Sequence, residues 1–150
     1  MSTLPTTASA SLAMPKGTRA RFSKSASAAQ CLNGFERGSM LTGLTFGQFS
    51  LIDLIQATLH ITGPADVAIS TWSAGFYDAH AAKNFRDSGA MRSLRFVMDA
   101  GQQKRGQATQ GQVAELFGAE NVRTARSHAK FAIISNEDWQ VAITSSMNLN

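Results

Sequence analysis

Two kinds of hydrophobic repeat alternate along the chain after residue 43. Apolar side chains recur every three or four residues in 44–60, 77–87 and 110–117, which is the spacing of one helix face. Short apolar runs fill 67–72, 94–98, 131–134 and 139–143, and Val122 marks one more; such runs are typical of buried strands. The pattern predicts the order helix, strand, helix, strand, helix, and then three strands.

This order predicts an α/β fold. Strands that alternate with helices usually pair in parallel, and the helices pack against the sheet. The last two strands are separated by a short turn, so they are expected to pair as an antiparallel hairpin. We therefore expect a mixed, mostly parallel sheet flanked by helices and ending in a β-hairpin.

The helix predicted at 44–60 has the clearest end signals. Thr45 and Gln48 have the spacing of a capping box, and Leu44 and Phe49 occupy the hydrophobic staple positions on either side. Gly63, directly before a proline, ends the helix.

Residues 1–35 differ in composition from the rest. They are rich in Ser, Thr and Ala, and no acidic residue precedes Glu36. We expect a disordered basic arm over 1–35 and one folded domain over 36–150. A solvated tail, a segment that contacts nucleic acid and an organellar transit peptide all share such a composition.

Composition limits the partners. The 150 residues are 43% hydrophobic, enough for one core, and the formal net charge is +4, which favours an anionic partner such as nucleic acid. The single cysteine, Cys31, excludes an intrachain disulfide and a structural zinc site and predicts a reducing, cytoplasmic location. No metal or cofactor motif and no apolar run of membrane-spanning length is present, so we expect no cofactor and no membrane partner.

The last quarter of the chain carries the candidate chemistry. His128 and Lys130 stand two apart before one apolar run, and Ser146 and Asn148 repeat that spacing after the next. Two adjacent strands would bring these four side chains to one patch. An ammonium group neutralises the charge of a phosphate, and an amide and a hydroxyl donate hydrogen bonds to the phosphate oxygens. An imidazole can attack phosphorus or transfer a proton. These residues predict a phosphoryl site.

The same residues resemble the HxK…GSxN signature of the phospholipase D superfamily. The resemblance implies that His128 forms a phosphohistidine or acts as general acid, that Lys130 binds phosphate, and that Ser146 and Asn148 hold it. Ser135 stands where the family has an aspartate, and Ser145 stands where it has glycine. The family also carries an acidic residue beyond the asparagine. Either the domain is truncated at Asn150 or its activity is weakened.

The resemblance implies a phospholipase D-like catalytic domain over 36–150 that acts as a homodimer. The family uses two histidines, and its small nucleases supply one from each subunit. We expect a metal-independent phosphodiesterase, most simply a DNA endonuclease, in which one His128 attacks and the other protonates the leaving oxygen. Arg123, Arg126 and Ser145 are the expected substrate-binding residues around this centre.

Three alternatives stay open. A catalytically silent nucleic-acid-binding module would keep the basic groove without turnover. A lipid phosphodiesterase of the same family is the second, although lipid enzymes usually carry two HxK motifs in one chain. A purely structural protein is the third, and it would leave the four convergent side chains without a purpose.

Overall fold

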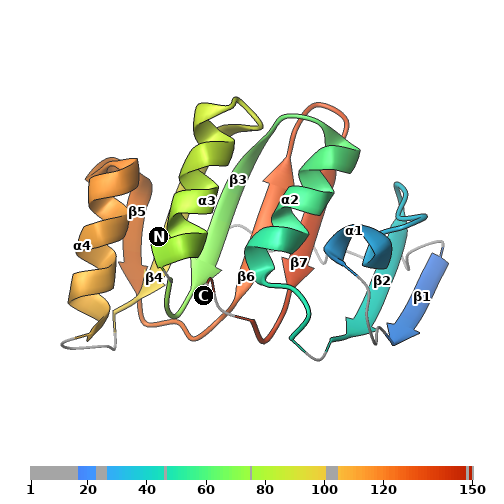
Figure 1. Cartoon of the computed structure of the whole chain (residues 1–150), viewed down its shortest axis with the longest axis horizontal. Coiled ribbons are helices and arrows are strands. Elements are labelled where there is room, and N and C mark those ends of the chain that lie inside the picture. The colour runs from blue at the N-terminus through green and yellow to red at the C-terminus, as the bar shows by residue number, and fades with distance from the viewer. Residues whose placement is uncertain are drawn as a thin grey trace, which may run out of the picture.

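The chain folds into an α/β structure with one five-stranded sheet and one two-stranded sheet (Figure 1). The computed structural model describes residues 17–22, 27–45, 47–74, 76–100, 105–147 and 149. The elements within them are β1 (Gly17–Phe22), α1 (Ala28–Cys31), β2 (Ser39–Leu44), α2 (Leu51–Thr62), β3 (Ala65–Thr71), α3 (Phe76–Asp87), β4 (Met91–Asp99), α4 (Arg105–Phe117), the 3-10 turn η1 (Ala119–Asn121), β5 (Val122–Ala125), β6 (Phe131–Ser135) and β7 (Gln140–Thr144).

The large sheet is mixed, with the strand order β5-β4-β3-β6-β7. β3 pairs in parallel with β4, and β4 with β5, because a helix returns the chain between them. β6 and β7 form the predicted hairpin, and β6 runs antiparallel to β3. Two pairings are therefore parallel and two antiparallel, where the sequence predicts a mostly parallel sheet. The difference arises because the connection from β5 to β6 contains no helix and reverses the strand direction.

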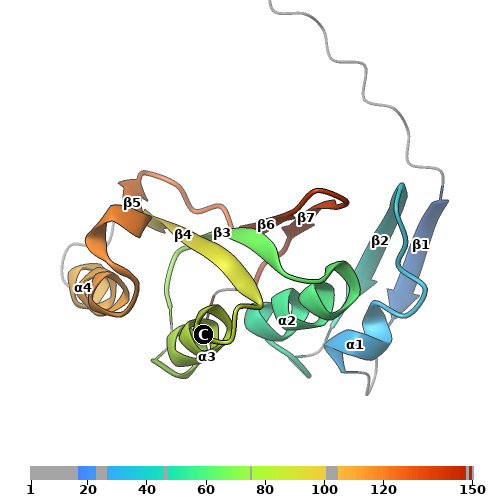
Figure 2. The ribbon, with the colours of Figure 1, turned by 90° about the horizontal axis from the view of Figure 1, so that it is seen from above.

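One face of the large sheet carries the core. Helices α2, α3 and α4 lie on the same side of the sheet (Figure 2). Alternate residues of β6 show this sidedness: Ala132 and Ile134 are fully buried, whereas Ile133 between them is 40% exposed. Apolar residues of this sheet face and of the helices that cover it, among them Phe96 of β4 and Leu51 of α2, form one continuous cluster.

The start of α2 differs from the prediction. The helix begins at Leu51, and its cap is Ser50, whose side chain accepts from the Asp53 N–H while the Asp53 carboxylate accepts from the Ser50 N–H. The predicted start at Leu44 is wrong because β2 extends to that residue and Gly47 has a φ of 81°, which no helical turn adopts. The predicted end is confirmed: Gly63, with a φ of 75°, follows Thr62.

Regular structure is present within the range for which the sequence predicts a disordered arm. β1 pairs in parallel with β2 over six residues, and Ser27 caps α1. Ala28 and Leu32 pack with Phe49 and Ala57 in a small second cluster beside α2. Within 1–35, residues 1–16 and 23–26 lie outside the described part of the chain. No helix in the described ranges is long and apolar enough to cross a membrane.

Candidate functional site

The candidate residues lie where the chain crosses from β5 to β6. Figure 1 shows this connection running along the lower edge of the sheet, past the ends of β4 and β3. The Ala100 N–H donates to the carbonyl of Ala125 at 2.9 Å, which places the start of the connection at the end of β4. Open α/β sheets commonly bind ligands outside the carboxyl ends of their parallel strands. The connection therefore occupies the edge of the sheet where a ligand site is expected.

His128 and Lys130 contact each other within this connection. The Lys130 Nζ lies 3.3 Å from the His128 Nδ1 and donates to the His128 carbonyl at 3.3 Å. An ammonium group can only donate, so this contact requires an unprotonated Nδ1 and places the proton of a neutral imidazole on Nε2. The imidazole is exposed and meets the Trp72 indole edge to face, with ring centroids 5.3 Å apart.

Hydroxyl groups hold the connection on either side of His128. The Ser127 Oγ accepts from the Ala129 N–H at 3.2 Å, and the Ser127 N–H donates to the Ala125 carbonyl at 3.0 Å. From β3, the Ser70 hydroxyl donates to the Ala129 carbonyl at 2.9 Å. Residues 127–130 belong to no helix or strand, so these contacts hold their path.

The second half of the motif meets the first through the hairpin register. Phe131 pairs with Thr144, and the Ser145 N–H donates to the Lys130 carbonyl at 3.2 Å. The hairpin therefore brings the residues after β7 beside the residues before β6. This juxtaposition is the one that the sequence predicts for the two motif halves.

The individual residues of the second half differ in their surroundings. The Ser145 Oγ accepts from the Met147 N–H at 3.0 Å and so shapes the turn after β7. Ser146 is exposed. Asn148 lies outside the described residues. Leu149 is fully buried, and its N–H donates to the Thr71 Oγ1 at 3.1 Å.

The two predicted arginines occupy different places. Arg126 is exposed and stands two residues before His128. Arg123 lies in β5, paired with Val97, and its Nη1 donates to the Glu120 carbonyl at 3.2 Å. β5 is three strands away from β6, which corresponds to about 14 Å. Arg126 is thus close to the candidate site along the chain, and Arg123 is on the distant edge strand.

Ser135, at the position of the family's aspartate, lies at the opposite end of β6 from Lys130. It pairs with Gln140 at the start of β7. The turn that joins these strands is held by Asn136, whose Oδ1 accepts from the Trp139 N–H at 2.9 Å and whose Nδ2 donates to the Thr62 carbonyl at 2.9 Å. Residues 135 and 136 therefore build the hairpin turn and do not contact the His128 end.

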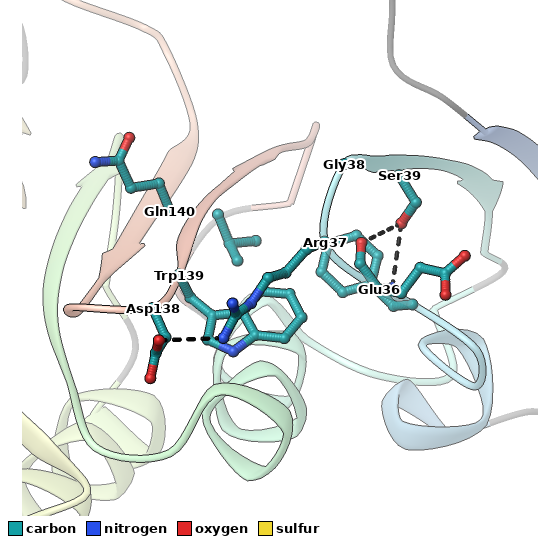
Figure 3. A pocket seen from close by; sticks show the side chains of 9 residues that line it. Glu36, Arg37, Gly38, Ser39, Asp138, Trp139 and Gln140 are labelled. Atoms are coloured by element: carbon teal, nitrogen blue, oxygen red, sulfur yellow. Dashed lines mark hydrogen bonds and ion pairs between the residues drawn. The ribbon is translucent and has the colours of Figure 1, made fainter.

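A cavity of about 200 Å³ lies at this far end of the hairpin, between residues 35–39 and 138–141 (Figure 3). The Arg37 guanidinium lies over the Trp139 ring, 5.3 Å from its centroid, and pairs with the Asp138 carboxylate at 3.3 Å. Phe35 stacks against the same indole, with centroids 6.2 Å apart. The cavity is lined by none of the candidate phosphoryl residues. It marks the contact between the α1–β2 segment and the hairpin.

In the described part of the chain, no three His, Cys, Asp or Glu side chains come together in a way that could hold a metal ion. Away from the His128–Lys130 pair, burial, followed by the charge of Asp53, raises the pKa of Asp78 near the start of α3.

The sequence pattern does not single out the residues at the end of β3. Ser70 and Thr71 are 1% and 0% exposed, and Trp72 contacts the candidate histidine. A signal was available: two hydroxyl residues in tandem inside an apolar run must each find a hydrogen-bond partner when buried. The partners, in residues 129 and 149, are too far along the chain for a local pattern to identify.

Fold and site together define an α/β protein with a histidine–lysine pair at the carboxyl edge of its parallel strands. Comparison with protein-family models, with curated proteins and with solved structures finds no match to this chain. The chemistry of the pair is therefore the basis for any assignment of function.

Proposed function

We propose that this protein is a metal-independent phosphodiesterase of the phospholipase D type, and that its substrate is DNA. The observation that carries the proposal is the contact between Lys130 and His128, with the turn after β7 hydrogen-bonded beside them. An anion binder next to an imidazole is the minimal set for phosphoryl transfer without a metal ion.

The proposed reaction uses two copies of His128 from a homodimer. The Nε2 of one imidazole attacks phosphorus and forms a phosphohistidine, and the P–O bond to the leaving group breaks. The second ring, protonated on both nitrogens, gives its Nε2 proton to the leaving oxygen and becomes neutral. It then takes a proton from the water that hydrolyses the intermediate and returns to the imidazolium form. Lys130 and the donors of 146–148 stabilise the charge on the non-bridging oxygens.

Neither role is filled while the Lys130 ammonium donates to Nδ1, because that contact describes a neutral ring protonated on Nε2. The attacking ring needs an unprotonated Nε2. The general acid must be an imidazolium, protonated on both nitrogens, so that it becomes a neutral ring when it gives up its Nε2 proton. A bound phosphate attracts the ammonium away from Nδ1, because a charged acceptor competes better for it than a neutral ring nitrogen, and this frees Nδ1 to take the proton.

A nucleic-acid-binding module without turnover is the second candidate. It is favoured by the exposed Arg126, four residues before Lys130 in the chain, and by the net charge of +4. Binding of this kind weakens steeply with salt, since phosphate contacts release counterions. The two candidates share a ligand and differ only in whether a phosphodiester is broken.

The deciding experiment measures plasmid cleavage in EDTA by the wild-type protein and by His128→Ala. His60→Ala is the matched control, because His60 is an exposed histidine in the last turn of α2. We expect cleavage by the wild type and the control and at least a 10³-fold loss for His128→Ala, the scale of losing a nucleophile. If all three proteins bind DNA and none of them cleaves it, the result would favour the second candidate. Cleavage that EDTA abolishes, or that His128→Ala retains, would refute the proposed mechanism.

A further inference from the structure

Two buried hydroxyls at the end of β3 lie between the two halves of the candidate site. Ser70 and Thr71 are adjacent, so strand geometry directs their side chains to opposite faces of the sheet. Each hydroxyl makes a long-range contact: Ser70 donates to the Ala129 carbonyl at 2.9 Å, and Thr71 accepts from the Leu149 N–H at 3.1 Å. Ala129 stands between His128 and Lys130, and Leu149 follows Asn148. One strand end therefore contacts both motif segments.

These contacts determine backbone direction where regular structure is lacking. Residues 127–130 belong to no helix or strand, and the Ala129 carbonyl is fixed to the sheet by Ser70. A fixed peptide at Ala129 sets the directions in which the side chains on either side leave the chain. The Thr71 hydroxyl also donates to the Ser73 carbonyl at 2.6 Å, so its lone pairs point to the Leu149 N–H.

We infer that Ser70 and Thr71 are positioning residues, each for a different half of the phosphoryl site. Ser70 orients the imidazole and ammonium of His128 and Lys130, and Thr71, through Leu149, anchors the segment that follows β7. The inference rests on the proposed function, but its geometry has consequences that do not require turnover. Because the two hydroxyls act on separate segments, their removal gives separate effects.

The neighbouring Trp72 supplies a readout that does not depend on catalysis. Its indole centroid lies 5.3 Å from that of the His128 ring. An imidazole in contact with an indole changes the emission of that indole. In a Trp139→Phe background Trp72 is the sole tryptophan, so comparing its emission with that of the same protein carrying His128→Ala reports whether the His128 ring lies beside it.

The test compares Ser70→Ala and Thr71→Val with Thr58→Val. Thr58 is a matched control, since its hydroxyl is also 1% exposed and donates to a backbone carbonyl, that of Leu54 at 2.8 Å, within α2. Ser70→Ala is expected to lower kcat on plasmid DNA by roughly 10- to 100-fold with little change in KM, and to shift the Trp72 emission to that of His128→Ala. Ser70→Cys, which keeps a weak donor, is expected to fall between Ser70→Ala and the wild type.

Thr71→Val is expected to leave the emission profile intact and to raise the inhibition constant of inorganic phosphate by roughly tenfold. Thr71→Ser keeps the hydroxyl and is expected to restore phosphate inhibition. Wild-type values of kcat and emission in Ser70→Ala would overturn the role of Ser70. A phosphate inhibition constant for Thr71→Val equal to that of Thr58→Val would overturn the role of Thr71. If the wild type cleaves no DNA, the proposed function fails. The Trp72 emission still shows in that case whether Ser70 holds the imidazole.

Discussion

The contact between the α1–β2 segment and the hairpin can be measured through Arg37. Its guanidinium lies 5.3 Å from the Trp139 centroid and 3.3 Å from the Asp138 carboxylate. A cation–π contact at an exposed site contributes about 0.5 to 1 kcal/mol. The ion pair adds little, because the side chains of Arg37 and Asp138 are 59% and 72% exposed and water screens them. Arg37→Ala is therefore expected to lower the free energy of unfolding by about 0.5 to 1 kcal/mol.

Arg92 offers a matched control for this prediction. It pairs with the exposed carboxylate of Glu137 at 2.5 Å, with no aromatic ring among the contacts described for its guanidinium. Equilibrium unfolding in urea, followed by circular dichroism, gives the midpoint for each variant. With a slope of roughly 2 kcal/mol per M, the loss at Arg37 corresponds to a midpoint shift of about 0.25 to 0.5 M. Arg92→Ala is expected to shift the midpoint less.

Salt separates the two contributions at Arg37. Sodium chloride at about 1 M screens exposed ion pairs but leaves the contact with the indole largely intact. The effect of Arg37→Ala should therefore persist at high salt, and it should fall to the effect of Arg92→Ala when Trp139 is replaced by leucine. Equal effects of the two arginine substitutions with Trp139 present would contradict the argument. The α1–β2 segment would then not be held by the stack in Figure 3.

Three further predictions concern stability and ionisation. Asp78→Asn is expected to raise the free energy of unfolding at pH 7 by roughly 1 kcal/mol or less, because the Asp78 Oδ2 is buried without a hydrogen-bond partner among the described residues and its pKa is raised. The sign follows from linkage: both states are protonated below about pH 3.9, and stability falls as pH rises through the folded pKa, so the advantage should vanish at pH 3 in a urea titration. Ile134→Ala should cost roughly 2 to 4 kcal/mol in the same assay and Ile133→Ala less than about 1 kcal/mol, since the first is fully buried and the second is 40% exposed; equal costs would contradict the assigned faces of β6. Arg92→Ala should raise the pKa of Glu137, which the hydrogen bond from Arg92 lowers, and a carboxylate titration by NMR that shows no change would refute this pairing.

The elements with strong local signals were predictable from the sequence. Glycines bound α3 and α4 at their carboxyl ends, and apolar runs mark β3, β4, β6 and β7. The start of α2 was not predictable, because Thr45 with Gln48 and Ser50 with Asp53 both have the spacing of a capping box, and the structure uses the second. β2 was missed because its side chains are mostly exposed, which leaves no alternation in hydrophobicity to detect.

The candidate site shows the same division between local and distant information. The spacing of His128 and Lys130, followed by a hairpin, suffices to predict that the residues after β7 lie beside them. Ser70 and Thr71 could not be assigned partners, because their contacts span 59 and 78 residues. A strand pattern indicates that a hydroxyl is buried but does not identify the segment that it meets.

The central claim is that His128 becomes covalently bonded to phosphorus during cleavage. The most direct test mixes the protein with an end-labelled DNA oligonucleotide in EDTA, quenches the reaction in alkali to preserve phosphohistidine, and maps the label by mass spectrometry. The account predicts an acid-labile nucleotide adduct on the tryptic peptide 127–130, absent from His128→Ala and unchanged in His60→Ala. An adduct at His60 or His80, or cleavage without any adduct in the wild-type protein, would contradict it.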